Sequence, residues 1–166
     1  MLRIGMQERW IRVSLAAQQL ELREGDTCHR IYPVSTGLNG AGERIGSEQT
    51  PRGAHEVAAL IGDAAPWGAV FVGRQFTGEI CTPALRADQP ARDWILTRIV
   101  WLAGLEDGRN RGGDVDTFSR YIYIHGTPDD EPMGVPHSHG CIRMRNADVI
   151  ELFDQLAVGT RVQIDE

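Results

Sequence analysis

Two short segments in the C-terminal third concentrate the residue types that do chemistry. His137, His139 and Cys141 alternate in the segment HSHGCIRM, and His125 lies upstream in the segment IHGT. A nearby histidine can take the proton of a cysteine thiol and stabilise the thiolate, which is the nucleophile. The glycine before Cys141 permits a tight turn whose backbone N–H groups converge on a developing oxyanion. These features favour covalent catalysis by Cys141 with His125 as its base.

The same residues also allow a metal site. On an extended strand His137, His139 and Cys141 would share one face, and His125 would add a further nitrogen ligand for zinc. However, this spacing is not a recurrent zinc motif, and the sequence Ser138-His-Gly indicates a turn. We therefore expect no metal and no other cofactor, and keep zinc as the alternative.

The two remaining cysteines are interpreted as structural. Neither Cys28 nor Cys81 has a glycine-rich turn and a histidine placed to activate it, and Cys28 and His29 would point to opposite faces of a strand. Because free cysteine is among the most buried residue types, we expect both to be buried and inert. Three cysteines cannot all pair, so at least one thiol is free, which fits a reducing compartment.

The amino-acid composition narrows the classes of protein to which this chain can belong. The chain has 166 residues, about one domain, with a net charge of −6 and 17 basic residues that are all arginine. A basic stripe is missing, so binding to nucleic acid or to an acidic membrane is not expected. The N-terminal segment MLRIGMQERW carries neither a signal peptide nor a membrane anchor. The sequence thus predicts a cytoplasmic location, or a periplasmic one if the chain has been trimmed.

The elements that must position the reactive residues are mostly strands. Alternating or continuous apolar runs separated by turn signals predict strands, the last of the internal ones over Tyr121–Ile124. The expected strand regions are 10–16, 18–24, 27–36, 54–62, 67–73, 93–104, 120–126 and 160–164.

One helix is expected after the cysteine segment. Asn146 is the predicted N-cap, Val149 and Phe153 recur on one helical face, and Gly159 ends the helix. The polar loop 106–117 is long enough to act as a lid, although a solvated connector is the simpler interpretation.

The stretch from His125 to Ile164, HGT followed by a spacer and SHGCIRM, closely resembles the catalytic signature of the L,D-transpeptidase family (YkuD-type domains). The upstream strands, with the segment TPRG, resemble the N-terminal half of the same domain, so the likeness covers nearly the whole chain. It implies a single catalytic domain, residues 1–166. The implied fold is mainly β with a few helices, with mixed β-sheets around a cleft.

The resemblance also implies roles for individual residues. Cys141 matches the nucleophile and His125 the general base, and the carbonyl of Gly126 is placed to orient that histidine. The backbone N–H groups of His139, Gly140 and Cys141 match the oxyanion hole.

On the substrate side, the resemblance points to Ser138 and Arg143. Ser138 matches the Ser/Thr position and supports the turn, while Arg143 replaces the asparagine of the narrow pattern and is suited to hold a substrate carboxylate. His137 has no family role and is expected to face solvent. Weaker candidates for a carboxylate contact are Arg98, Arg109 and Arg111.

The family acts on the peptidoglycan stem tetrapeptide. Its cysteine attacks the carbonyl at the L-centre of the diaminopimelate and expels the terminal D-alanine, so the implied partners are a muropeptide or stem peptide and, as a covalent inhibitor, a carbapenem. With water as the acceptor, the enzyme is an L,D-carboxypeptidase of peptidoglycan recycling. The missing signal and a covering loop 106–117 favour this interpretation. The alternatives are an L,D-transpeptidase that uses an amine acceptor and a non-catalytic metal- or muropeptide-binding module.

Overall fold

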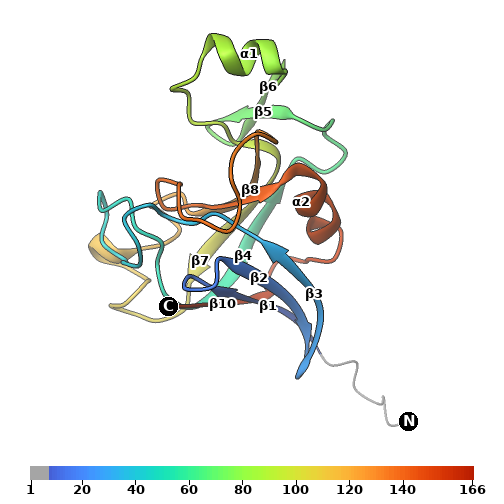
Figure 1. The fold of residues 1–166 in the computed structure, drawn as a ribbon. Helices are drawn as coiled ribbons and strands as arrows, with labels where there is room; N and C mark the ends of the chain where they lie inside the picture. Colours follow the sequence, from blue (N-terminus) through green and yellow to red (C-terminus); the bar gives the residue numbers. More distant parts are fainter. Residues whose placement is uncertain (1–7) are drawn as a thin grey trace.

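The computed structural model describes residues 8–166, and this part of the chain is built mainly from strands (Figure 1). Ten strands pair into one curled sheet, accompanied by two short α-helices and one 3-10 turn. The prediction of a mainly β fold with a few helices is confirmed. The elements are β1 (Arg9–Ser14), β2 (Gln19–Glu24), β3 (Thr27–Pro33), β4 (Gly53–Ile61), β5 (Ala69–Val72), β6 (Gln75–Ile80), α1 (Pro83–Asp88), β7 (Leu96–Gly104), η1 (Gly113–Val115), β8 (Tyr123–Thr127), β9 (Ile142–Arg145), α2 (Asn146–Phe153) and β10 (Arg161–Asp165).

The sheet branches at β7. The main path runs β3-β2-β1-β10-β4-β7-β5-β6, and β8 pairs with β7 on one side and with β9 on the other. The β8–β9 pair is parallel and places His125 in register with Arg143. This pairing brings the segments IHGT and HGCIRM, separated in sequence, side by side.

The alternating apolar residues of the first two strands point into one core. Ile11 and Val13 of β1 and Leu20 and Leu22 of β2 are buried together, and α2 packs against β7, β8 and β9. Burying a side chain of this size contributes roughly 1.5–3 kcal/mol. The core therefore fixes the platform on which β8 and β9 lie.

A smaller unit of β5, β6 and α1 lies at the far end of the molecule from β1–β3 (Figure 1). Its helix α1 was not expected from the sequence. Thr82 caps it by accepting a hydrogen bond from the Leu85 N–H at 3.1 Å, and Pro83 starts its first turn. Leu85 packs against Val70, Trp94 and Leu96 and joins the unit to the sheet.

The helix α2 differs from its prediction at both ends. Arg145 is its N-cap, whereas Asn146 is the first helical residue and turns its side chain inward to the carbonyl of Thr127. The helix ends at Phe153, and turns occupy the chain up to Gly159, which has a φ of +93°. Among residues 8–166, no helix is both long and apolar enough to span a bilayer.

Two further expectations are corrected. Cys28 is exposed on β3 and Cys81 is half-buried, so neither is the fully buried thiol expected. The strand predicted from Tyr121 begins only at Tyr123, because Tyr121 adopts a left-handed backbone with a φ of +58°. This break places Tyr121 and Tyr123 on either side of Cys141, as described below.

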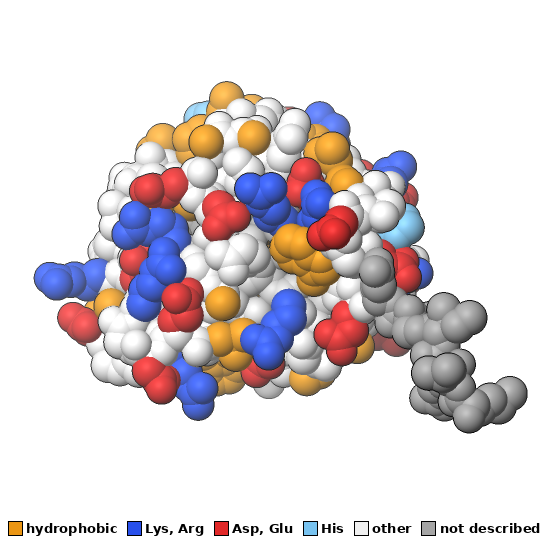
Figure 2. Space-filling view, turned by 90° about the horizontal axis from the view of Figure 1, so that it is seen from below, with side chains coloured by type: hydrophobic (Ala, Val, Ile, Leu, Met, Phe, Trp, Pro, Cys, Tyr) orange, Lys and Arg blue, Asp and Glu red, His pale blue; other side chains and the backbone are white. Residues whose placement is uncertain are grey.

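Charged side chains of both signs are interspersed on the face shown in Figure 2. Arg12 pairs with Asp165 at 3.2 Å, and Arg52 pairs with Glu43 and Glu166 at 3.0 Å each. The more exposed Arg12–Asp165 pair contributes at most about 1 kcal/mol. These pairs neutralise much of the arginine charge locally rather than gathering it into a stripe.

Candidate active site

A cavity of about 430 Å³ brings together the reactive residues singled out in the sequence. Its lining includes Cys141, His125, His139, Ser138 and Arg143. It also includes residues that the sequence analysis missed: Asp93, Arg120, Arg74, Tyr121 and Tyr123.

His125 is held rigidly inside β8. Its side chain is 1% exposed, and its Nδ1 lies 2.6 Å from the carbonyl oxygen of Gly126. A carbonyl only accepts hydrogen bonds, so Nδ1 carries the proton and Nε2 is left as a base. Burial lowers the pKa of His125, although the Gly126 carbonyl opposes that shift. The ring is therefore neutral at neutral pH and ready to accept a proton.

The turn before Cys141 is built by hydrogen bonds to its own backbone. The Ser138 hydroxyl donates to the Cys141 carbonyl at 2.5 Å and accepts from the Gly140 N–H at 3.1 Å, and Thr50 donates to the Gly140 carbonyl at 2.9 Å. Gly140 has a φ of +121°, a conformation that favours glycine. The Ser138 hydroxyl therefore holds the turn that presents Cys141, and a contact with substrate stays a prediction.

The thiol of Cys141 lies between two backbone groups near the start of β8, the Tyr121 carbonyl and the Tyr123 N–H. Sγ accepts from the Tyr123 N–H at 3.3 Å and donates to the Tyr121 carbonyl at 3.4 Å. Burial raises the pKa of Cys141 to about 12, although the Tyr123 N–H and the nearby Arg143 and Arg120 charges favour the thiolate. The resting group is therefore a neutral thiol, which needs a base to become a nucleophile.

Two of the three expected oxyanion donors are free. The Gly140 N–H is already bonded to Ser138. The N–H groups of His139 and Cys141 have no acceptor among residues 8–166. The expectation of three donors is corrected to these two in the resting structure.

Arg143 lines the cavity but is not free. Its side chain is only 10% exposed, and its guanidinium lies 3.5 Å from Asp93 and 3.9 Å from Glu131, and donates to the His137 carbonyl at 3.3 Å. A substrate carboxylate would have to compete with Asp93, which is itself half-exposed. Arg143 is one of three arginines that line the cavity, and its direct contact with substrate stays a prediction.

The weaker arginine candidates lie elsewhere. Arg98 is buried and donates to the carbonyls of Ala65 and Thr97, while Arg109 and Arg111 pair with acidic neighbours in their own loop. Two arginines of the cavity, Arg74 and Arg120, were not expected from the sequence. Arg120 donates to the carbonyls of Glu43 and Gln49 at 3.0 and 2.7 Å.

The loop 106–117 does not serve as a lid in this structure. None of its residues lines the cavity, and Asn110 ties it to β4 by donating to the carbonyls of Arg52 and Ala54 at 3.0 Å each. In this structure the loop therefore does not cover the site, which favours the connector over the lid.

No metal-binding cluster is formed within residues 8–166. Nowhere in this range do three His, Cys, Asp or Glu side chains come together as ligands. His137 is exposed, as expected, and His139 turns toward Asp93 at 4.0 Å. The alternation that suggested zinc therefore does not create a shared face.

The chain is similar to known proteins along nearly its whole length. A family model described as the L,D-transpeptidase catalytic domain (YkuD) matches residues 8–164. The Probable L,D-transpeptidase YbiS of Escherichia coli K12 is 52% identical over 48 residues, which cover 28% of this chain and 16% of YbiS. The Putative L,D-transpeptidase YkuD of Bacillus subtilis is 42% identical over 62 residues, or 34% of this chain and 38% of that protein. The matched segments span well under half of these relatives.

Solved structures share the fold. An L,D-transpeptidase from Mycobacterium tuberculosis, solved with a faropenem-derived adduct, superimposes with a TM-score of 0.59 at 18% identity and covers 98% of this chain and 61% of its own. A second L,D-transpeptidase, solved in complex with imipenem, has a TM-score of 0.56 at 17% identity, with 97% and 60% covered. At these identities the likeness concerns the fold.

Proposed function

The chain belongs to the L,D-transpeptidase catalytic-domain (YkuD) family, and from that premise we propose that it is an acyl-transfer enzyme that acts on the peptidoglycan stem tetrapeptide. The bond attacked is the one between the L-centre of diaminopimelate and the terminal D-alanine. The observation that supports this most is the single cavity that holds Cys141, the buried His125 and two free N–H donors.

The geometry supports a two-step reaction through Cys141. His125 Nε2 takes the thiol proton, Sγ bonds to the substrate carbonyl carbon, and the N–H groups of His139 and Cys141 hold the oxyanion. The carbon–nitrogen bond to D-alanine then breaks, His125 returns the proton to the leaving amine, and a thioester remains. An acceptor amine or water then attacks the thioester and restores the thiol.

The acceptor decides between the two members of this reaction class. One argument for hydrolysis was a covering loop 106–117, and that loop does not line the cavity. The named relatives are transpeptidases, so we propose an amine acceptor first and hydrolysis to the tripeptide as the second candidate. The cytoplasmic location expected from the sequence stays a prediction.

A soluble diaminopimelate tetrapeptide tests this proposal. We expect purified protein to release D-alanine and, with excess D-amino acid or acceptor stem present, to give mainly exchanged or dimeric products by liquid chromatography and mass spectrometry. Tripeptide as the dominant product under both conditions would establish the carboxypeptidase instead. Release of no D-alanine would remove the enzyme proposal and favour a binding module.

We expect Arg143→Ala to lower kcat/KM for the tetrapeptide tens-fold or more. Losing one charge-assisted contact costs about 1.5–3 kcal/mol, and the nearby Asp93 is then left without its partner. Steady-state kinetics of D-alanine release measure the effect. Arg109→Ala is the matched control, because Arg109 pairs with Glu106 away from the cavity. Equal kcat/KM in the two variants would remove Arg143 from the substrate site.

A further inference from the structure

The Gly126 peptide, whose carbonyl orients His125, is itself closely packed against neighbouring residues. Gly126 accepts the Nδ1–H of His125 on its carbonyl, and it lies against β7 in the β7–β8 pair, opposite Leu96. A Cβ added at Gly126 would collide with the Asn146 side-chain oxygen and would lie 2.6 Å from the Leu96 carbonyl oxygen and 3.2 Å from the Cβ of Thr97. The position of this peptide therefore depends on its contacts with Thr97 and Asn146.

Thr97 adopts a backbone conformation that is unusual for its residue type. It is fully buried in β7 with a φ of +73°, a region that β-branched residues rarely enter. It also lies where the β7–β8 register shifts, between Leu96 and Ile99, so the strand pairing is irregular at this point. Such strain persists only where the surroundings fix it, and it is concentrated at functional sites.

Hydrogen bonds of the Thr97 side chain, one of them to Asn146, hold Thr97 in this backbone conformation. The Thr97 hydroxyl accepts from the Gly68 N–H at 3.0 Å and donates to Asn146 Oδ1 at 2.6 Å. Asn146 Nδ2 in turn donates to the Thr127 carbonyl at 2.9 Å and to Asp129 at 3.1 Å. Thr97 thus lies against Gly126 from β7. Asn146 lies against Gly126 as well and is bonded to Thr127, the residue that follows Gly126.

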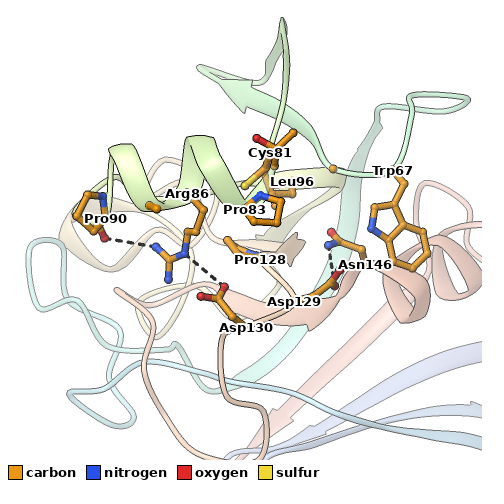
Figure 3. A pocket seen from close by; sticks show the side chains of 13 residues that line it. Trp67, Cys81, Pro83, Arg86, Pro90, Leu96, Pro128, Asp129, Asp130 and Asn146 are labelled. Atoms are coloured by element: carbon orange, nitrogen blue, oxygen red, sulfur yellow. Dashed lines mark hydrogen bonds and ion pairs between the residues drawn. The ribbon is translucent and has the colours of Figure 1, made fainter.

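This network borders a different cavity from the one that contains the thiol. Asn146, Leu96 and Asp129 line a second cavity of about 670 Å³, where Figure 3 shows the Asn146 amide bonded to Asp129 beside Trp67. Thr97 and Asn146 do not line the cavity that contains Cys141. Their contacts with Gly126, whose carbonyl holds the His125 ring, give these side chains a route to the reaction from outside that cavity.

We propose that Thr97 and Asn146 are positioning residues that hold the Gly126 carbonyl in place and so keep His125 in the Nδ1–H tautomer with Nε2 facing the cavity. The inference rests on the proposed role of His125 as the base. The Asn146 side chain packs against Gly126 and donates to the carbonyl of Thr127, and the Thr97 hydroxyl holds that side chain in its orientation. The unusual backbone at Thr97 brings its hydroxyl within reach of both Gly68 and Asn146.

Thr97→Val is the sharpest test, because valine keeps the β-branch and the backbone strain and removes only the hydroxyl. We expect kcat for the tetrapeptide to fall about tenfold to a hundredfold with KM within about twofold, since a small misplacement of a base is costly. The Gly126 contact raises the pKa of His125. A looser contact should therefore move the acid limb of the kcat/KM profile to lower pH.

Thr117→Val is the matched control. Thr117 is also fully buried and its hydroxyl also makes a side-chain hydrogen bond, to His55 Nε2 at 2.9 Å, but it lies outside the Cys141 cavity. We expect Thr117→Val to lower the melting temperature and leave kcat and the pH profile unchanged. Thr97→Ser, which keeps the hydroxyl, should return kcat to within about threefold of the wild-type value.

The tautomer is read independently of activity by the ¹⁵N shifts of the His125 ring, assigned with His125→Gln. We expect one Nδ1–H tautomer in the wild-type protein and a mixture of tautomers in Thr97→Val. If that variant does not fold, Asn146→Asp, which loses the donor to Thr127, gives the same comparison. A wild-type tautomer together with a wild-type kcat would overturn the inference. If the wild-type protein shows no turnover, the proposed function is refuted. The ¹⁵N shifts of the His125 ring then test by themselves whether Thr97 and Asn146 hold its tautomer.

Discussion

Cys141→Ala is expected to abolish both D-alanine release from the tetrapeptide and the mass adduct that we expect imipenem to form with the wild-type protein. Alanine cannot form the thioester, and Cys141 is the only thiol among the residues that line the cavity with His125. The relatives solved with imipenem and with a faropenem-derived adduct motivate the choice of probe. Chromatography of D-alanine and intact-mass spectrometry measure the two effects.

The other cysteines supply matched controls for this experiment. Cys28 is exposed and therefore open to adventitious modification, whereas Cys81 is half-buried in the wall of the second cavity. Burial raises the pKa of the Cys81 thiol and keeps it unreactive. Cys28→Ala and Cys81→Ala should keep full turnover and full adduct. An imipenem adduct that survives in Cys141→Ala and disappears in Cys28→Ala would contradict the assignment of the nucleophile.

The strand pattern was readable because it is local. In β1 and β2, alternate residues such as Ile11, Val13, Leu20 and Leu22 point into the core, and the sequence shows this period of two directly. The helix α1 also had a local signal, Thr82 followed by Pro83, which is a typical helix start.

Other features of the site depend on contacts between distant segments. Asp93 and Arg120 join the cavity only because β7 and β8 pair with each other and β9 pairs with β8. The prediction of Asn146 as a helix cap failed for a similar reason: its side chain is used by Thr127 and Thr97, which the helix pattern alone does not reveal. Residue types and spacing identified the chemistry, whereas the partners that tune it required the fold.

His125→Gln is expected to lower kcat by two to four orders of magnitude, the usual effect of removing a general base. The loss is large here because burial raises the pKa of Cys141 to about 12, so almost no thiolate exists without a base to take the proton. Glutamine is close to histidine in size and polarity, but it cannot accept a proton at neutral pH. Single-turnover release of D-alanine measures the acylation step directly.

The pH dependence of kcat/KM is a second test of His125 as the base. The base works in its neutral form, and burial lowers the pKa of His125 below its ordinary 6.5. The neutral form therefore persists as the pH falls, and the acid limb of kcat/KM in the wild-type protein should have its midpoint below pH 6.5. That limb should vanish in His125→Gln, while His137→Gln, which changes an exposed histidine next to the motif, should keep it. An acid limb that is unchanged in His125→Gln would show that another group is the base.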